Sequence, residues 1–114
     1  MIQIKRVYDD YSELDGYRIL VDRLWPRGIS KENAKVDLWI KEITPSNDLR
    51  KWYHDNLDKR IQFEKKYLLE IENNSDSLNE IEKILNEKKT ITLVTASKDP
   101  KPIHAVILKQ KLAE

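Results

Sequence analysis

The sequence predicts an α/β protein: a single three-layer domain over residues 1–114, with a small, mostly parallel sheet of three or four strands flanked by helices. Two observations predict this fold class. Apolar, β-branched runs at 19–21 and 91–94 are typical of strands that are buried on both faces of a sheet. Between and after these runs, apolar residues recur at helical spacing, which predicts helices packed around that sheet.

The first strand is predicted around Ile2, Ile4 and Val7, where apolar and polar residues alternate. Residues 9–16 connect it to the second strand, which lies in the apolar run 17–24. The connector ends in an Asp-Gly pair, which marks a turn. Because this connector is short for a parallel crossover, the relative direction of the two strands stays open.

Three helices are predicted between the two central strands. The first begins near Thr44, an N-cap candidate, with Pro45 at the first helical position. The second and third carry apolar stripes over 61–71 and 78–85, and polar residues at 73–75 separate them. This order predicts a helical layer between the second strand and the last one.

The end of the chain repeats the strand-to-helix order. A strand at 91–95 leads into residues 96–100, and a helix with apolar residues from 103 to 112 follows. Asp99 is the expected cap of this helix, with Pro100 at its first position. Both central strands therefore lead into polar loops, the places where ligands bind in open α/β sheets.

The charge balance excludes several function classes. The 114 residues include 21 Lys and Arg and 20 Asp and Glu, so the formal net charge is +1. Such a balance excludes a broad surface for nucleic acids or membranes. The chain has no cysteine and two glycines, so it has no disulfide, Cys-based zinc site, P-loop or dinucleotide fingerprint. We expect no metal and no cofactor.

The start of the chain becomes charged at Lys5 and Arg6, before an apolar signal segment could form. The longest apolar runs, such as 105–108, are too short to cross a bilayer. We expect a soluble cytoplasmic protein that is a monomer or a weak homo-oligomer.

Polar residues that suit an anion follow the two central strands. Arginine offers a planar fork for phosphate or carboxylate, and tryptophan offers a flat face for a ring. We predict a ligand site formed by Arg23, Trp25, Arg27, Gly28, Arg50, Ser97, Lys98 and His104. The alternative is that the arginines pair with Asp22 or Glu42 in a structural network.

His104 is the candidate acid or base of a catalytic site, because a histidine side chain titrates near neutral pH. Asp22 or Asp99 would be its partner, and Ser97 could complete a Ser-His-Asp set. The alternative is that His104 is a neutral, hydrogen-bonding residue at a helix N-terminus. The sequence contains neither His-Glu-x-x-His nor Gly-x-Ser-x-Gly.

Several segments carry a resemblance to a known family. Residues 5–9, 15–28, 39–46, 49–50, 96–99 and 104–105 with Leu108, including the string Val-Asp-Arg-Leu-Trp-Pro-Arg-Gly at 21–28, resemble the YeaO-like family within domain of unknown function 488. The resemblance runs from end to end and implies a small bacterial-type α/β protein without an assigned activity. Family members usually place asparagine where this chain has Ile103. More distant superfamily members often carry a cysteine beside the histidine. Because this chain has no cysteine, thiol chemistry is excluded here.

Three functions remain open. The first is a binding or sensing module with an arginine-lined pocket for a nucleotide or another phosphorylated small molecule. The second is a hydrolase or an enzyme that cleaves a glycosidic bond, using His104 with Asp22 or Asp99. The third is a structural or interaction protein, in which these polar residues only brace the loops.

Overall fold

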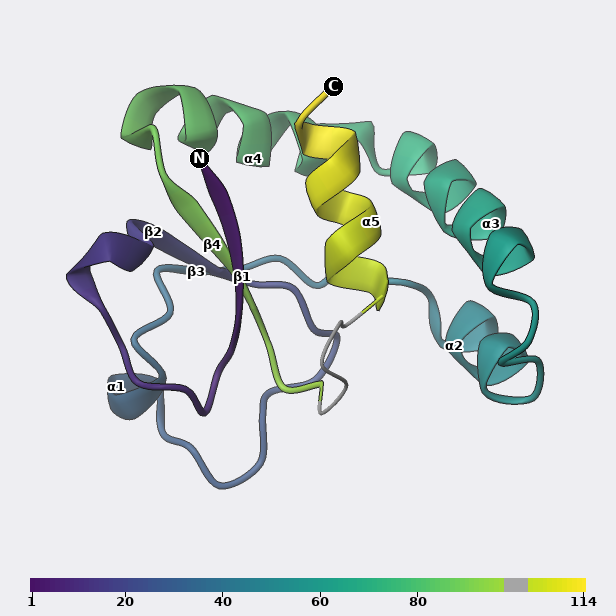
Figure 1. Cartoon of the computed structure of the whole chain (residues 1–114), viewed down its shortest axis with the longest axis horizontal. Helices are drawn as coiled ribbons and strands as arrows, with labels where there is room; N and C mark the ends of the chain where they lie inside the picture. The colour runs from purple at the N-terminus through teal and green to yellow at the C-terminus, as the bar shows by residue number, and fades with distance from the viewer. Residues whose placement is uncertain (98–102) are drawn as a thin grey trace.

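The computed structural model describes residues 1–97 and 103–114. It contains a four-stranded sheet, one 3₁₀ helix and five α-helices among these residues (Figure 1). The strands are β1 (Ile2–Arg6), β2 (Tyr17–Leu20), β3 (Leu38–Trp39) and β4 (Ile91–Thr95). The helices are η1 (Glu13–Asp15), α1 (Lys31–Ala34), α2 (Asn47–His54), α3 (Arg60–Asn73), α4 (Ser75–Lys88) and α5 (Ile103–Leu112). None of the described helices is long and apolar enough to cross a membrane.

The sheet is parallel throughout and has the order β1-β4-β2-β3. The last strand in the sequence lies at the centre, where Leu93 pairs with Ile4 on one side and with Ile19 on the other. All five residues of β4 are buried, as its continuous apolar pattern predicts. The α/β fold class is confirmed, and the direction of the first two strands, which the sequence left open, is settled as parallel.

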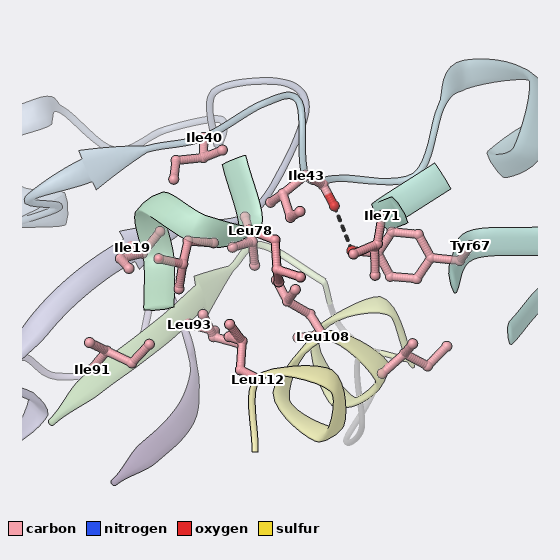
Figure 2. Close-up of a cluster of buried hydrophobic side chains, with 14 of the residues drawn as sticks. Ile19, Ile40, Ile43, Tyr67, Ile71, Leu78, Ile91, Leu93, Leu108 and Leu112 are labelled. Carbon is pink, nitrogen blue, oxygen red and sulfur yellow. Dashed lines mark hydrogen bonds between the residues drawn. The ribbon is translucent and has the colours of Figure 1, made fainter. Parts of the chain in front are cut away.

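The helical layer covers one face of the sheet. Ile19 of β2 and Leu93 of β4 point into a core that α3, α4 and α5 close (Figure 2). Tyr67 on α3 is fully buried there and donates a hydrogen bond of 2.6 Å to the carbonyl of Ile43. This bond ties the segment before α2 to the helical layer.

The opposite face is covered by the thinner third layer. Val94 of β4 and Val7 pack there against Ala34, the last residue of α1. Neither this four-residue helix nor the two-residue edge strand β3 was predicted as an element. Trp39 lies half-buried in β3.

The predicted helices are confirmed, with two corrections to their bounds. Of the residues 73–75 that were expected to separate two helices, only Asn74 does so, because α3 runs to Asn73 and α4 begins at Ser75. The expected N-cap at Thr44 with Pro45 as the first helical residue is wrong. The cap of α2 is Ser46, whose hydroxyl accepts from the amide of Leu49 at 3.1 Å. Glu70 on α3 fixes this choice, because its carboxylate accepts from both the amide and the hydroxyl of Ser46, at 2.8 and 2.6 Å. The expected cap and first turn at 99–100 lie outside the described residues.

Gly16 is the glycine that the fold needs most. Its φ is +65°, and a Cβ built on it would lie 2.3 Å from the carbonyl oxygen of Thr90. We expect Gly16→Ala to lower the free energy of unfolding by about 1–3 kcal/mol, because the main chain next to β4 must move. Gly28→Ala is the matched control: its φ is +76° with open space around it. Urea unfolding of both variants checks this, and equal losses would mean that the close approach to Thr90 costs nothing.

Candidate functional site

A cleft of about 780 Å³ opens at the carboxyl ends of the central strands. The lining residues come from the end of β1 and the residues after it, the loop after β2, α2 with the segment before it, α3, the end of β4 and the start of α5. Figure 1 shows where these elements lie. The polar and aromatic side chains that line it are Arg6, Tyr8, Asp22, Arg23, Trp25, Arg27, Thr44, Arg50, Tyr53, His54, Phe63, Thr95, Ser97 and His104.

Six of the eight residues that sequence reasoning assigned to the ligand site line this cleft. They are Arg23, Trp25, Arg27, Arg50, Ser97 and His104. Gly28 does not line it, and Lys98 lies outside the described residues, as does the catalytic candidate Asp99. The structure thus brings together side chains that are up to 81 positions apart, between Arg23 and His104.

Four guanidinium groups line the cleft, from Arg6, Arg23, Arg27 and Arg50. Among the described residues that line it, the only carboxylate is Asp22. No ion pair within residues 1–97 and 103–114 involves any of these arginines. The cleft is therefore strongly cationic in a chain whose formal net charge is only +1.

Arg23 is held by main-chain oxygens. Its Nε donates to the carbonyl of Pro45 at 3.2 Å, and Nη2 donates to that of Thr44 at 3.0 Å. The alternative that Arg23 pairs with Asp22 or Glu42 is wrong, because neither residue forms an ion pair with it. These two bonds fix the loop after β2 against the segment that leads into α2.

Arg6, Tyr8 and Arg27 form one wall of the cleft. The Nε of Arg6 donates to the carbonyl of Ser97 at 3.0 Å, and its guanidinium lies 5.2 Å from the centre of the Tyr8 ring. The Tyr8 hydroxyl donates to the main-chain carbonyl of Arg27 at 2.7 Å. We call these three residues the Tyr8 wall.

A second wall comes from α2. Arg50, Tyr53 and His54 are spaced by three and four positions, so they project from one side of the helix. The Tyr53 ring stacks on Phe63, with ring centres 4.3 Å apart and planes inclined by 22°. We call Arg50, Tyr53 and His54 the Tyr53 wall.

Asp22 and His104 meet on the floor of the cleft. Asp22 accepts from the Thr95 hydroxyl and the Ala96 amide, both at 2.6 Å. The Nε2 of His104 lies 3.0 Å from the carbonyl of Val21 and 3.4 Å from Oδ1 of Asp22. Since a carbonyl only accepts, Nε2 carries a hydrogen, and Nδ1 is the ring nitrogen that remains for a proton or a ligand.

The pKa of Asp22 lies below its ordinary value. Burial by itself raises the pKa of this carboxyl, but hydrogen bonds from His104, Thr95 and Ala96 together outweigh that effect. Asp22 is therefore a carboxylate at neutral pH, and its oxygens are already engaged with the ends of β4 and α5. It stabilises the floor of the cleft more than it offers an acceptor to a ligand.

Trp25 does not present the open ring face that the sequence suggested. Its indole N–H donates to the carbonyl of Ile29 at 2.8 Å, and its ring meets Trp39 edge-on, with centres 5.5 Å apart. The ring also packs against the apolar cluster of Val7, Ala34 and Val94 on the face of the sheet that α1 covers. Trp25 lines the cleft, but contacts within the protein hold its ring in place. The aromatic rings of the Tyr8 wall and the Tyr53 wall are Tyr8 and Tyr53.

Sequence reasoning missed Arg6, Tyr8, Tyr53 and His54 as site residues. Two signals could have found them. Tyr8 follows the strand predicted around Ile2, Ile4 and Val7, and Arg6 is the last residue of β1, so both obey the same carboxyl-end rule that selected the loops after the central strands. Tyr53 and His54 lie three and four positions after Arg50 on a predicted helix, which places them on its face.

The chemistry available in the cleft is that of hydrogen-bond donors. In the part of the chain that the structure describes, no group of three His, Asp or Glu side chains could hold a metal ion. The Thr44 and Thr95 hydroxyls donate inward, to the carbonyl of Lys41 and to Asp22. Guanidinium donors of this kind have the geometry that matches the oxygens of phosphate and carboxylate groups.

A catalytic set is only partly present. Asp22 and His104 are in contact, but the hydroxyl of Ser97 makes no hydrogen bond to His104 among the described residues. The structure thus has an Asp-His pair that makes no hydrogen bond to a serine hydroxyl within the described residues.

Comparisons with known proteins place this sequence in a family. The family described as "Inactive DUF488-N3 subclade" (DUF488-N3i) matches residues 1–114. The chain is 44% identical over 107 residues to the "Uncharacterized protein YeaO" of Escherichia coli K12, covering 94% of this chain and 92% of that protein. It is 39% identical over 111 residues to the "Uncharacterized protein Rv3073c" of Mycobacterium tuberculosis H37Rv, covering 97% and 92%. No solved structure gives a significant match.

Proposed function

Because the chain belongs to the DUF488-N3i family, described as the inactive DUF488-N3 subclade, we propose that it is a binding or sensing module and not an enzyme. The resemblance to YeaO-like proteins that the sequence carries is confirmed by this family and by the relative from Escherichia coli. The relatives are uncharacterised, so the ligand has to be argued from the cleft.

The observation that carries this proposal is the set of four guanidinium groups around one cleft. With Asp22 as the one carboxylate among the described lining residues, the fixed charges sum to +3, four guanidiniums less one carboxylate. Arginine forks match phosphate oxygens in two-bond geometry, and they keep their charge at every physiological pH. The cleft therefore suits a phosphorylated small molecule.

The lining also suits a ring-bearing ligand. Tyr8 and Tyr53 supply aromatic rings, and Leu24 and Leu57 are exposed apolar side chains of the same cleft. Its volume falls within the range of roughly 300–1,000 Å³ that is typical of small-molecule sites. We therefore favour a nucleotide, which joins phosphate to an apolar ring, over a phosphorylated sugar.

One observation favours the enzymatic alternative. Asp22 orients His104 in the manner of a carboxylate that supports a general base. Two observations weigh against an enzyme. The family is described as inactive, and both carboxylate oxygens of Asp22 already accept hydrogen bonds, from Thr95 and Ala96. Turnover of a nucleotide that is lost in His104→Gln would decide for the enzyme.

The test is a calorimetric titration with adenosine 5′-monophosphate, with adenosine as the phosphate-free control. Arg50→Gln should weaken nucleotide binding by about tenfold or more, because a charge-assisted hydrogen bond to phosphate is lost. Arg60→Gln is the matched control, since Arg60 is also an exposed helical arginine but does not line the cleft. It should bind as the wild type does.

Thermal unfolding provides a second readout on the same proteins. Nucleotide at about 100 times its dissociation constant should stabilise the wild type by about 2.7 kcal/mol, whereas adenosine should add little. Absence of any stabilisation by the nucleotide, or equal responses of Arg50→Gln and the wild type, would remove the proposed function and leave a structural role for the arginines.

A further inference from the structure

Each wall of the cleft combines an aromatic ring with two cationic or titratable side chains. The Tyr8 wall holds its ring next to Arg6 and Arg27, and the Tyr53 wall holds its ring next to Arg50 and His54. The Tyr8 wall comes from the end of β1, the residues after it and the loop after β2, and the Tyr53 wall comes from α2. The end of β1 and α2 lie apart in Figure 1, with the start of α5 between them. Since each wall combines an aromatic ring with cationic side chains, the cleft has two places for a ring and its phosphate.

Both rings are held in place by contacts within the protein. Tyr8 is 43% exposed, yet its hydroxyl is fixed on the carbonyl of Arg27 and Arg6 lies over its ring. Tyr53 is backed by Phe63 in a stacked pair. Rings that are fixed before a ligand arrives lose little freedom when a base stacks on them.

The charge of the cleft also exceeds what one phosphate can neutralise. A phosphate monoester carries about 1.5 to 2 negative charges at pH 7, against the +3 of the fixed groups in the described lining. A 3′–5′ phosphodiester next to a 5′-phosphate carries about 2.5 to 3 negative charges in all, which would bring the balance close to zero, whereas a 5′–5′ diphosphate carries about two. Arg23, on the loop after β2, adds a guanidinium that belongs to neither wall.

On the strength of the proposed function, we propose that the cleft binds two nucleoside units linked through phosphate, with one base on Tyr8 and the other on Tyr53. The shared chemistry is that of a dinucleotide. It could come from a strand end, with a 3′–5′ phosphodiester, or from a soluble dinucleotide, with a 5′–5′ diphosphate.

The experiment compares three probes by calorimetry on the full chain: adenosine 5′-monophosphate, the 5′-phosphorylated dinucleotide pApA, and two adenosines joined 5′–5′ by a diphosphate. At least one dinucleotide should bind wild type about tenfold more tightly than the mononucleotide, because a second base stacks. The dinucleotide that binds more tightly identifies the source of the ligand.

Variants of the two rings locate the bases. Tyr8→Leu and Tyr53→Leu should each reduce dinucleotide affinity to near that of the mononucleotide, whereas Tyr53→Phe, which keeps the ring, should stay within about twofold of wild type. Tyr8→Leu changes an exposed side chain, so it serves even if Tyr53→Leu fails to fold.

Two outcomes overturn different claims. If the mononucleotide and both dinucleotides bind wild type equally, the cleft holds one nucleoside unit, and the two-unit proposal fails while the proposed function stands. If none of the three probes binds, the proposed function itself fails.

Discussion

Replacing Asp15 with alanine should lower the free energy of unfolding by about 3–5 kcal/mol. Asp15 and Arg18 are 2% and 1% exposed, and Nη1 of Arg18 lies 2.6 Å from Oδ2 of Asp15. Lys5 adds a second cation at 3.2 Å. Without Asp15, the guanidinium of Arg18 would remain buried with only the carbonyls of Ala34 and Lys35 as acceptors, so its charge would be uncompensated.

Urea unfolding at neutral pH measures this loss. Asp10→Ala is the matched control, because Asp10 is an exposed aspartate close by, and its removal should change stability by no more than about 0.5 kcal/mol. A loss below about 1 kcal/mol for Asp15→Ala would show that water reaches Arg18 and that this pair is not a buried one.

Asp22→Ala should have the second-largest effect, a loss of about 2–4 kcal/mol. The carboxylate accepts hydrogen bonds from Thr95 and Ala96, and hydrogen bonds to a charged acceptor contribute about 1.5–3 kcal/mol each. Its removal also takes away the contact of Asp22 with His104 at the start of α5, which leaves His104 with the carbonyl of Val21. Urea unfolding checks the value, with the exposed Asp58→Ala as control. A variant as stable as wild type would mean that water replaces the carboxylate without cost.

The same residue gives stability a pH dependence of defined sign. The folded-state pKa of Asp22 is lowered, although burial opposes this, by its hydrogen bonds from His104, Thr95 and Ala96. Its stabilisation is therefore fully present above the unfolded pKa of about 3.9 and is lost as pH falls through the lower folded value. Asp22→Asn should show a smaller loss of stability between pH 5 and pH 3 than wild type does. Identical pH profiles would contradict this assignment.

The centre of the sheet could be predicted because its signal is local. The apolar run at 91–94 predicts a strand from the sequence alone, and all five residues of β4 (Ile91–Thr95) are buried in the structure. The amphipathic stripes of α3 and α4 are equally local. The order of strands could not be predicted, because β4 inserts between β1 and β2 through pairings more than 70 residues apart. The start of α2 was misplaced for a similar reason, since Glu70 selects Ser46 from 24 positions away.

The candidate site shows the same division. Arg23, Arg27 and His104 follow from the rule that ligands bind at the carboxyl ends of parallel strands. The role of Trp25 could not be foreseen, because its ring is committed to Ile29 and Trp39 by contacts that only the folded loop creates. Tyr53 lies three positions after Arg50 on a predicted helix, so its place beside Arg50 was predictable, but its stacking on Phe63 of α3 was not.

The central claim, that the arginine-lined cleft binds a phosphorylated ligand, is tested most directly by NMR of the arginine side chains. The six arginines provide their own controls, because Arg18 is buried in the ion network and Arg60 does not line the cleft. On titration with adenosine 5′-monophosphate, we expect shifts with one dissociation constant in the Nε–H resonances of Arg6, Arg23, Arg27 and Arg50. Those of Arg18 and Arg60 should stay in place. Unshifted cleft resonances at millimolar nucleotide, or shifts of equal size at Arg60, would contradict the account.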